Sequence, residues 1–115
     1  MSKIPVLYSN PRCSTCRNAK ALLEEKKLAF ITKLYLEEPP NKVELAHLAD
    51  TYVGDLKDLI RNKDLVKKGL EPIEILTKEV FIDLILQYPE YLQRPLLVFE
   101  DKTIVGRPIE NFTIN

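Results

Sequence analysis

The sequence lacks an excess of either charge and lacks any long apolar run. Lysine plus arginine and aspartate plus glutamate each total 17 among 115 residues. The chain therefore offers nucleic acid or an anionic membrane no long-range attraction, and we expect neither as a partner. No stretch approaches the roughly 18 to 20 apolar residues of a membrane-spanning helix. Because the first residues also form too short an apolar run for a secretory signal, we expect a cytoplasmic protein.

Metal-binding side chains are equally scarce. The chain contains two cysteines, Cys13 and Cys16, and one histidine, His47. These side chains cannot supply the four ligands of a closed zinc site, so we expect no bound metal in the monomer. Cytosolic thiols are kept reduced, so a lone pair of cysteines is more often reactive or metal-binding than a structural disulfide. Free cysteines are also often ordinary buried hydrophobic residues, and their position must decide between burial and chemistry.

The composition and the first third of the chain predict a folded α/β domain. Hydrophobic residues make up 45% and charged residues 30% of the sequence, which is typical of one globular domain, here over residues 1–115. Residues 3–8 form a short apolar run that predicts a strand. Apolar residues at helical spacing predict an amphipathic helix from residue 14 to about 27. Residues 29–36 alternate with both sides partly apolar, which predicts a second strand covered on two faces.

The rest of the chain predicts a helical insertion followed by a hairpin. Asn41 is a helix cap, and Gly54 is expected to close the helix that Asn41 begins. Short helical pieces continue over about residues 55–92. Two apolar runs, 96–99 and 103–105, are separated by a polar turn and predict a β-hairpin. The fold class is therefore α/β, a mixed sheet flanked by helices, with a helical insertion before the C-terminal β-hairpin.

The two cysteines occupy different positions on the first predicted helix. Cys13 lies at its start, where unpaired backbone amides and the helix dipole favour negative charge and lower the pKa of a thiol. The same place suits a bound oxyanion. Cys16 shares a helix face with Ala19 and Leu22, so its sulfur is expected to lean toward the core and to react less readily. The spacing of the two cysteines nevertheless allows a disulfide between them.

The dipeptide Arg94-Pro95 directly precedes the predicted hairpin. A proline is tolerated as the first residue of a strand, and most such peptide bonds are trans. A cis bond is the alternative, and it would set a backbone loop beside an active site. The sequence leaves both interpretations of Pro95 open.

Together these features resemble the thioredoxin fold, in which a cis-proline faces a cysteine motif at a helix start. More specifically, the sequence resembles the glutaredoxin-coupled arsenate reductase family and its Spx-type relatives. The matching stretches occur in the same order through nearly the whole chain: "YSNPRCSTCRNAKALLEE", "YLEEPPN", "LIRNKD", "RPLLV" and "GRP". A lone CxxC motif would be a weak signal, but this ordered set is a strong one.

The resemblance implies a set of site residues. Reductases of this family use one cysteine as nucleophile and three arginines to hold the arsenic oxyanion. By motif, the nucleophile is Cys13 and the arginines are Arg61, Arg94 and Arg107, while Arg17 in "CRN" is a further candidate for substrate binding. Guanidinium groups are always charged and bind oxygens two at a time, so they offset the repulsion between a thiolate and an oxyanion.

The activity implied by the resemblance is the reduction of arsenate, a small oxyanion, to arsenite by a monomer without a bound cofactor. Glutathione with glutaredoxin, or thioredoxin as a transient redoxin partner, would supply the electrons. Cys16 is a candidate resolving cysteine, while Ser9 stands where well-studied reductases have a histidine. Two alternatives remain: a Spx-type redox-sensing regulator that binds RNA polymerase, and a general thiol-disulfide oxidoreductase. Spx-type proteins keep the CxxC motif but lack the full arginine set, which favours the enzyme.

Overall fold

The computed structural model describes residues 4–69 and 76–113, so Lys3, at the start of the first predicted strand, lies outside the described residues. The strands are β1 (Val6–Ser9), β2 (Ile31–Leu34), β3 (Leu96–Val98) and β4 (Thr103–Val105). The α-helices are α1 (Ser14–Glu25), α2 (Lys42–Thr51), α3 (Asn62–Lys67) and α4 (Lys78–Gln87). The 3-10 helices are η1 (Leu56–Leu59), η2 (Pro89–Tyr91) and η3 (Ile109–Thr113). Within these described ranges no helix is both long and apolar enough to cross a membrane.

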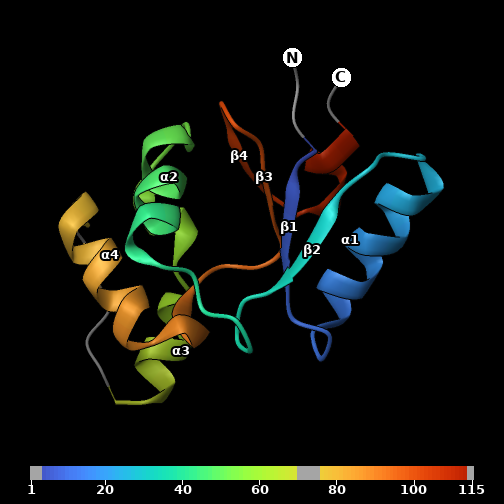
Figure 1. The fold of residues 1–115 in the computed structure, drawn as a ribbon. Helices are drawn as coiled ribbons and strands as arrows, with labels where there is room; N and C mark the ends of the chain where they lie inside the picture. The colour runs from blue at the N-terminus through green and yellow to red at the C-terminus, as the bar shows by residue number, and fades with distance from the viewer. Residues whose placement is uncertain (1–3, 70–75, 114–115) are drawn as a thin grey trace.

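The four strands form one mixed sheet in the order β2-β1-β3-β4. β1 is parallel to β2 and antiparallel to β3, and β3 and β4 form the predicted antiparallel hairpin. α1 makes the crossover that two parallel strands require. Figure 1 shows α1 on one face of the sheet and α2, α3 and α4 on the other. The predicted fold class, a mixed sheet flanked by helices with a helical insertion before the hairpin, is confirmed.

Side-chain alternation along the central strands divides the core between the two faces of the sheet. On one face Leu7 and Leu97 pack in a cluster with Ala19 and Leu23 of α1. On the other face Tyr8 joins a larger buried cluster with side chains of α2, α3 and α4. The sheet therefore fixes the start of α1, where the two cysteines lie, relative to the helical insertion, which carries Arg61 and leads into Arg94.

The boundaries of α2 match the prediction at one end only. Asn41 begins the helix with a reciprocal capping box, because its side chain accepts a hydrogen bond from the Glu44 amide and its own amide donates to the Glu44 carboxylate. The prediction that Gly54 closes the helix is wrong. The helix ends at Thr51, and Tyr52 takes an extended conformation that pairs with β4 through a single bridge. The pairing of Tyr52 with β4 therefore ends α2 before Gly54.

The second strand is shorter and more exposed than the sequence predicted. β2 covers Ile31–Leu34 instead of residues 29–36, and Ile31 is 57% exposed. The reason is its position at the edge of the sheet, where, within the described part of the chain, β1 is its only strand neighbour. Tyr35 directly follows the strand and is 0% exposed, so the chain is buried again immediately after it leaves the sheet.

Backbone contacts within the helical insertion hold two candidate arginines near one another. The Arg61 amide donates to the Tyr91 carbonyl at 2.8 Å, and the Gln93 amide donates to the Leu59 carbonyl at 2.8 Å. These bonds tie the segment before α3 to the segment before β3. Arg61 and Arg94 are far apart in sequence, but this pairing places their backbones close together.

Candidate active site

A short turn after β1 delivers Cys13 to the start of α1. The Cys13 amide donates to the Asn10 carbonyl at 2.9 Å, and the Arg12 amide donates to the Asn10 side chain at 3.0 Å. Cys13 itself is the cap residue and keeps an extended backbone with φ of −91° and ψ of 120°. The loop is thus braced by backbone bonds, and the sulfur is held at the helix start as the sequence predicted.

Cys13 is partly exposed, and its thiol is acidic. Burial acts to raise its pKa, but the backbone amide and thiol of Cys16 and the guanidinium groups of Arg94 and Arg107 outweigh burial and lower the pKa to about 7. The Cys13 side chain makes no capping hydrogen bond of good geometry to the first turn. The amide of Cys16 still faces the sulfur closely enough to favour its charge. About half of the thiol is therefore ionised at neutral pH.

Cys16 differs from Cys13 in both exposure and acidity. Its side chain is 0% exposed, and burial raises the pKa of its thiol to about 11. Hydrogen bonding to the Asn10 backbone, and to a smaller extent to Ser9, lowers this pKa but does not overcome burial. Cys16 is therefore a protonated thiol next to a partly ionised one, and it leans into the core as the helix spacing predicted.

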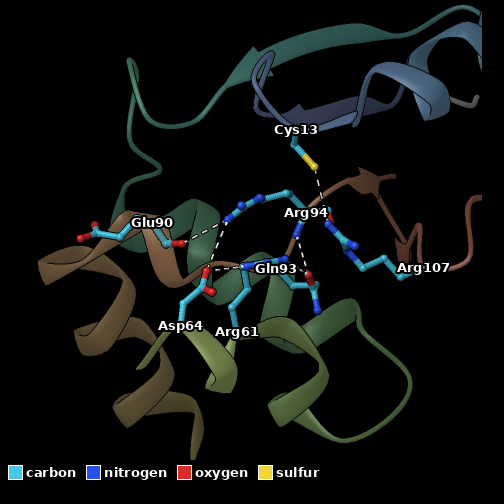
Figure 2. A network of polar contacts seen from close by, with 7 residues as sticks. All are labelled: Cys13, Arg61, Asp64, Glu90, Gln93, Arg94 and Arg107. Atoms are coloured by element: carbon cyan, nitrogen blue, oxygen red, sulfur yellow. Dashed lines mark hydrogen bonds and ion pairs between the residues drawn. The ribbon is translucent and has the colours of Figure 1, made fainter. Parts of the chain in front are cut away.

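Arg107 contacts the nucleophile from the end of β4. Its Nη2 lies 3.6 Å from the Cys13 sulfur, and its Nε donates to the Arg94 carbonyl at 2.7 Å, as Figure 2 shows. The Arg94-Pro95 peptide bond is cis, and the Gly106 amide donates to the Pro95 carbonyl at 2.9 Å. The end of β4 is thereby joined to the proline loop, so that both elements meet in front of the helix start.

Arg94 and Arg61 share one carboxylate. Arg61 Nε lies 2.7 Å from Asp64 Oδ2, whereas Arg94 Nη1 lies 4.0 Å from the same oxygen. A second donor of Arg61 reaches Gln93 Oε1 at 3.1 Å. The side chain of Arg94 is 17% exposed and extends to within reach of the Cys13 thiol, where it lowers the thiol pKa. Burial acts to raise the pKa of Asp64, but its hydrogen bond from Arg61 lowers the pKa overall.

The structure thus brings three of the four predicted arginines together with Cys13 and leaves the fourth outside this group. Arg94 and Arg107 lie at Cys13, and Arg61 joins them through Asp64 (Figure 2). Arg17 does not join this group. Its guanidinium is exposed and donates to the Pro11 carbonyl at 2.8 Å. In this arrangement Arg17 braces the turn before the nucleophile.

Sequence reasoning missed two polar residues of this network. Asp64 follows Arg61 by three positions in α3, and opposite charges at that spacing interact on a helix, so a signal for this pair was present. Gln93 carries no comparable signal. Its side chain accepts from both Arg61 Nη1 and the Arg94 amide, each at 3.1 Å, and this role follows only from the folded backbone.

The geometry suits attack by a thiolate on a small anion. Arg94 and Arg107 supply donors directed at one place, and a guanidinium can bind two oxygens of a tetrahedral anion at once. A cavity of about 420 Å³ shares Arg107 and Gln93 with the site and is also lined by Lys57 and Asp58. Among the described residues, no group of three or more His, Cys, Asp or Glu side chains is placed to hold a metal ion.

Known proteins resemble this chain along nearly its whole length. An arsenate reductase of Neisseria meningitidis is 34% identical over 108 residues, which cover 91% of this chain and 92% of that protein. The solved structure of an arsenate reductase from Vibrio cholerae is 27% identical with a TM-score of 0.77, covering 96% of this chain and 95% of that chain. This likeness confirms the predicted thioredoxin-like fold.

A second kind of relative is also similar. The global transcriptional regulator Spx of Streptococcus pneumoniae is 29% identical over 101 residues, which cover 87% of this chain and 76% of that protein. The model of the ArsC family matches residues 8–114. With this match over nearly all of its length and with the reductase at 34% identity, the chain belongs to the ArsC family.

Proposed function

We propose that this protein reduces arsenate to arsenite, with Cys13 as the nucleophile and Arg61, Arg94 and Arg107 as the oxyanion-binding residues. The observation that carries this proposal is the approach of Arg107 Nη2 to 3.6 Å from the Cys13 sulfur, whose pKa is lowered to about 7. A partly ionised thiol faced by guanidinium groups can attract an anionic substrate as well as attack it. The similarity to curated arsenate reductases supports arsenate as that anion.

The first step forms a covalent adduct. The Cys13 thiolate attacks arsenic, a sulfur–arsenic bond forms, and one arsenic–oxygen bond breaks as its oxygen takes up protons and leaves as water. Two unit charges about 4 Å apart repel by about 4 kcal/mol at an effective dielectric near 20, a penalty of roughly a thousandfold in rate. The arginines offset this repulsion, because their charge persists at every pH at which the thiolate exists.

The second step transfers the electrons. A second thiolate attacks the Cys13 sulfur, a disulfide forms, and the electron pair of the sulfur–arsenic bond stays on arsenic, which leaves as arsenite. The two sulfur atoms together supply the two electrons that reduce arsenic from the +5 to the +3 state. Another thiol then reduces the disulfide and restores Cys13.

An external thiol makes the second attack in this proposal. Cys16 is 0% exposed and burial raises its pKa to about 11, so very little of it is thiolate at neutral pH. Attack rates depend on the thiolate fraction and on access. Glutathione with glutaredoxin, or thioredoxin, provides an accessible thiol, and Cys16 is the slower internal alternative.

The test is a coupled assay of the purified protein with arsenate, comparing glutathione plus glutaredoxin with thioredoxin. Cys13→Ser should abolish arsenate-dependent oxidation of the reductant, whereas Lys78→Ala, which removes an exposed cation paired with Asp50, should leave it intact. Turnover that persists in Cys13→Ser would refute the assignment of the nucleophile.

Cys16→Ser then distinguishes the reductants. Unchanged turnover with glutathione and glutaredoxin, together with a loss of turnover with thioredoxin, would assign an internal disulfide to the thioredoxin route. Unchanged turnover with both donors would make Cys16 a core residue only.

The likeness to Spx favours a redox-sensing regulator as a second candidate function. In that case the CxxC motif would act as a sensor, and the protein would co-purify with RNA polymerase and show no arsenate turnover. A general thiol-disulfide oxidoreductase is separated by Arg94→Ala, since a disulfide substrate carries no oxyanion for Arg94 to bind. Loss of arsenate turnover with intact disulfide exchange supports the reductase, and loss of both contradicts it.

A further inference from the structure

Two buried polar atoms lie at the candidate active site without a hydrogen-bond partner among the described residues. They are the hydroxyl of Tyr35 and Nε of Arg94. Tyr35 directly follows β2 and is 0% exposed. Buried polar atoms are nearly always paired, and each unpaired atom costs free energy, so two of them at one site require an explanation.

The two unpaired atoms belong to neighbouring side chains. Burial raises the pKa of Tyr35 to about 12, and the positive charge of Arg94 is the strongest influence in the opposite direction. For Arg94, burial acts to lower the pKa, and Tyr35 is the first of the groups that raise it instead. The Tyr35 hydroxyl and the Arg94 guanidinium are therefore near enough to influence each other, while Nε and the hydroxyl each lack a hydrogen-bond partner among the described residues.

The remaining contacts of Arg94 leave its guanidinium weakly oriented. Its Nη1 lies 3.5 Å from the Glu90 carbonyl and 4.0 Å from Asp64 Oδ2, and both distances are long. By contrast, Arg107 is anchored by a bond of 2.7 Å to the Arg94 carbonyl. A bond at Nε would fix the plane of the Arg94 guanidinium and leave both Nη groups free for an anion.

We propose that Tyr35 is a positioning residue whose hydroxyl accepts the Nε–H of Arg94 and so directs the guanidinium toward Cys13 and a bound oxyanion. A hydroxyl can accept this bond while keeping its own proton, so a small side-chain movement satisfies both unpaired atoms. Anion binding pulls the guanidinium into place. The inference deepens the proposed function and rests on it only for the identity of the oxyanion.

Packing alone does not explain a tyrosine at this position. Phenylalanine would fill nearly the same volume without burying an unpaired hydroxyl. The hydroxyl is useful only if something pairs with it, and the neighbouring Arg94 side chain carries an unpaired buried donor at Nε. Tyr35 also directly follows β2, so this contact would connect the end of that edge strand to Arg94 in the loop before β3.

The test compares Tyr35→Phe with Tyr8→Phe. The second variant is the control, because it removes a hydroxyl from another buried tyrosine, whose charged neighbour is Glu44. The pH dependence of Cys13 alkylation by iodoacetamide, followed by mass spectrometry, reports the pKa of the thiol. In Tyr35→Phe we expect this pKa to rise and the thiolate fraction at pH 7 to fall about twofold. Protection of Cys13 by sulfate should weaken, and kcat/KM for arsenate should fall about tenfold through KM. Tyr8→Phe should change none of these.

Arg94→Lys provides the second variant, because lysine keeps the charge but lacks the planar Nε–H donor. If Tyr35 acts through Nε, Arg94→Lys alone shows the same defects, and adding Tyr35→Phe to it changes the Cys13 pKa no further. An unchanged Cys13 pKa and unchanged sulfate protection in Tyr35→Phe would overturn the proposal, as would equal effects in both backgrounds. A wild-type protein without arsenate turnover, but with these shifts, would refute the proposed function and leave the role of Tyr35 intact.

Discussion

Replacing Arg107 by alanine tests how strongly one guanidinium controls the nucleophile. Its Nη2 lies 3.6 Å from the Cys13 sulfur, and at that separation two unit charges attract by about 1 kcal/mol in water and about 5 kcal/mol at an effective dielectric near 20. The Arg107 side chain is exposed, so solvent screening places the effect near the lower value, about 1 kcal/mol. A loss of about 1 kcal/mol raises the pKa of the thiol by about 0.7.

The rise in the Cys13 pKa can be measured through the rate at which the thiol is alkylated. The Cys13 pKa is lowered to about 7 in the intact protein, so the thiolate fraction at pH 7 should fall about threefold in Arg107→Ala. The rate of iodoacetamide alkylation between pH 5 and pH 9, with the product located by mass spectrometry, measures that fraction. Lys78→Ala, which removes an exposed charge from α4, is the control. An alkylation profile that Arg107→Ala and Lys78→Ala leave equally unchanged would show that Arg107 does not control the thiol.

Three further predictions follow from the same contacts. The kcat/KM for arsenate should rise with pH through about 7, where Cys13 ionises, and level off above it; a midpoint above 8 would contradict an acidic thiol. Asp64 has a lowered pKa, so it stabilises the fold above its unfolded pKa, and that stability is lost as the pH falls through the folded value. Asp64→Asn should therefore lower the urea unfolding free energy by about 0.5 to 1 kcal/mol at pH 7, with no difference from wild type at pH 2. Gly106→Ala would bring a Cβ to 2.5 Å from the Phe112 ring, so it should cost about 1 to 3 kcal/mol of stability.

Local signals predicted those parts of the fold that depend on neighbours in sequence. The start of α1 at Cys13 follows from a turn directly before an amphipathic run, and the start of α2 follows from the cap residue Asn41. The hairpin of β3 and β4 likewise needs only two apolar runs and a polar turn. In each case the residues that decide the structure lie within one short stretch of the chain, the longest being the hairpin from Leu96 to Val105.

Long-range contacts decided what the sequence could not predict. Ile31 belongs to an alternating run that fits a covered strand, but the strand order places β2 at the sheet edge and leaves this side chain 57% exposed. Gly54 is a plausible helix end, but the bridge from Tyr52 to Thr103 ends α2 earlier. Neither strand order nor this bridge is encoded by spacing within one segment.

The residues of the candidate site likewise fall into those that local spacing predicted and those that it could not predict. The position of Cys13 and the burial of Cys16 followed from the spacing along one helix. The arginines could be named only through the family resemblance, because no periodicity relates residues 61, 94 and 107. Gln93 could not be predicted from the sequence because its role depends on the backbone hydrogen bond between Gln93 and Leu59. This bond brings the segment before α3 to the proline loop.

The charge balance of the site decides between an oxyanion and a neutral disulfide as the substrate. Asp64 offsets the charge of Arg61, with which it forms a contact of 2.7 Å, and this leaves Arg94 and Arg107 as two cations near Cys13. One thiolate neutralises only one of them, so a positive charge remains in the partly buried site. A neutral disulfide would leave that charge without a partner, whereas an anionic substrate supplies the missing negative charge and several acceptor oxygens. The unpaired Nε of Arg94 agrees with this argument, because in our proposal a bound anion draws that guanidinium into place.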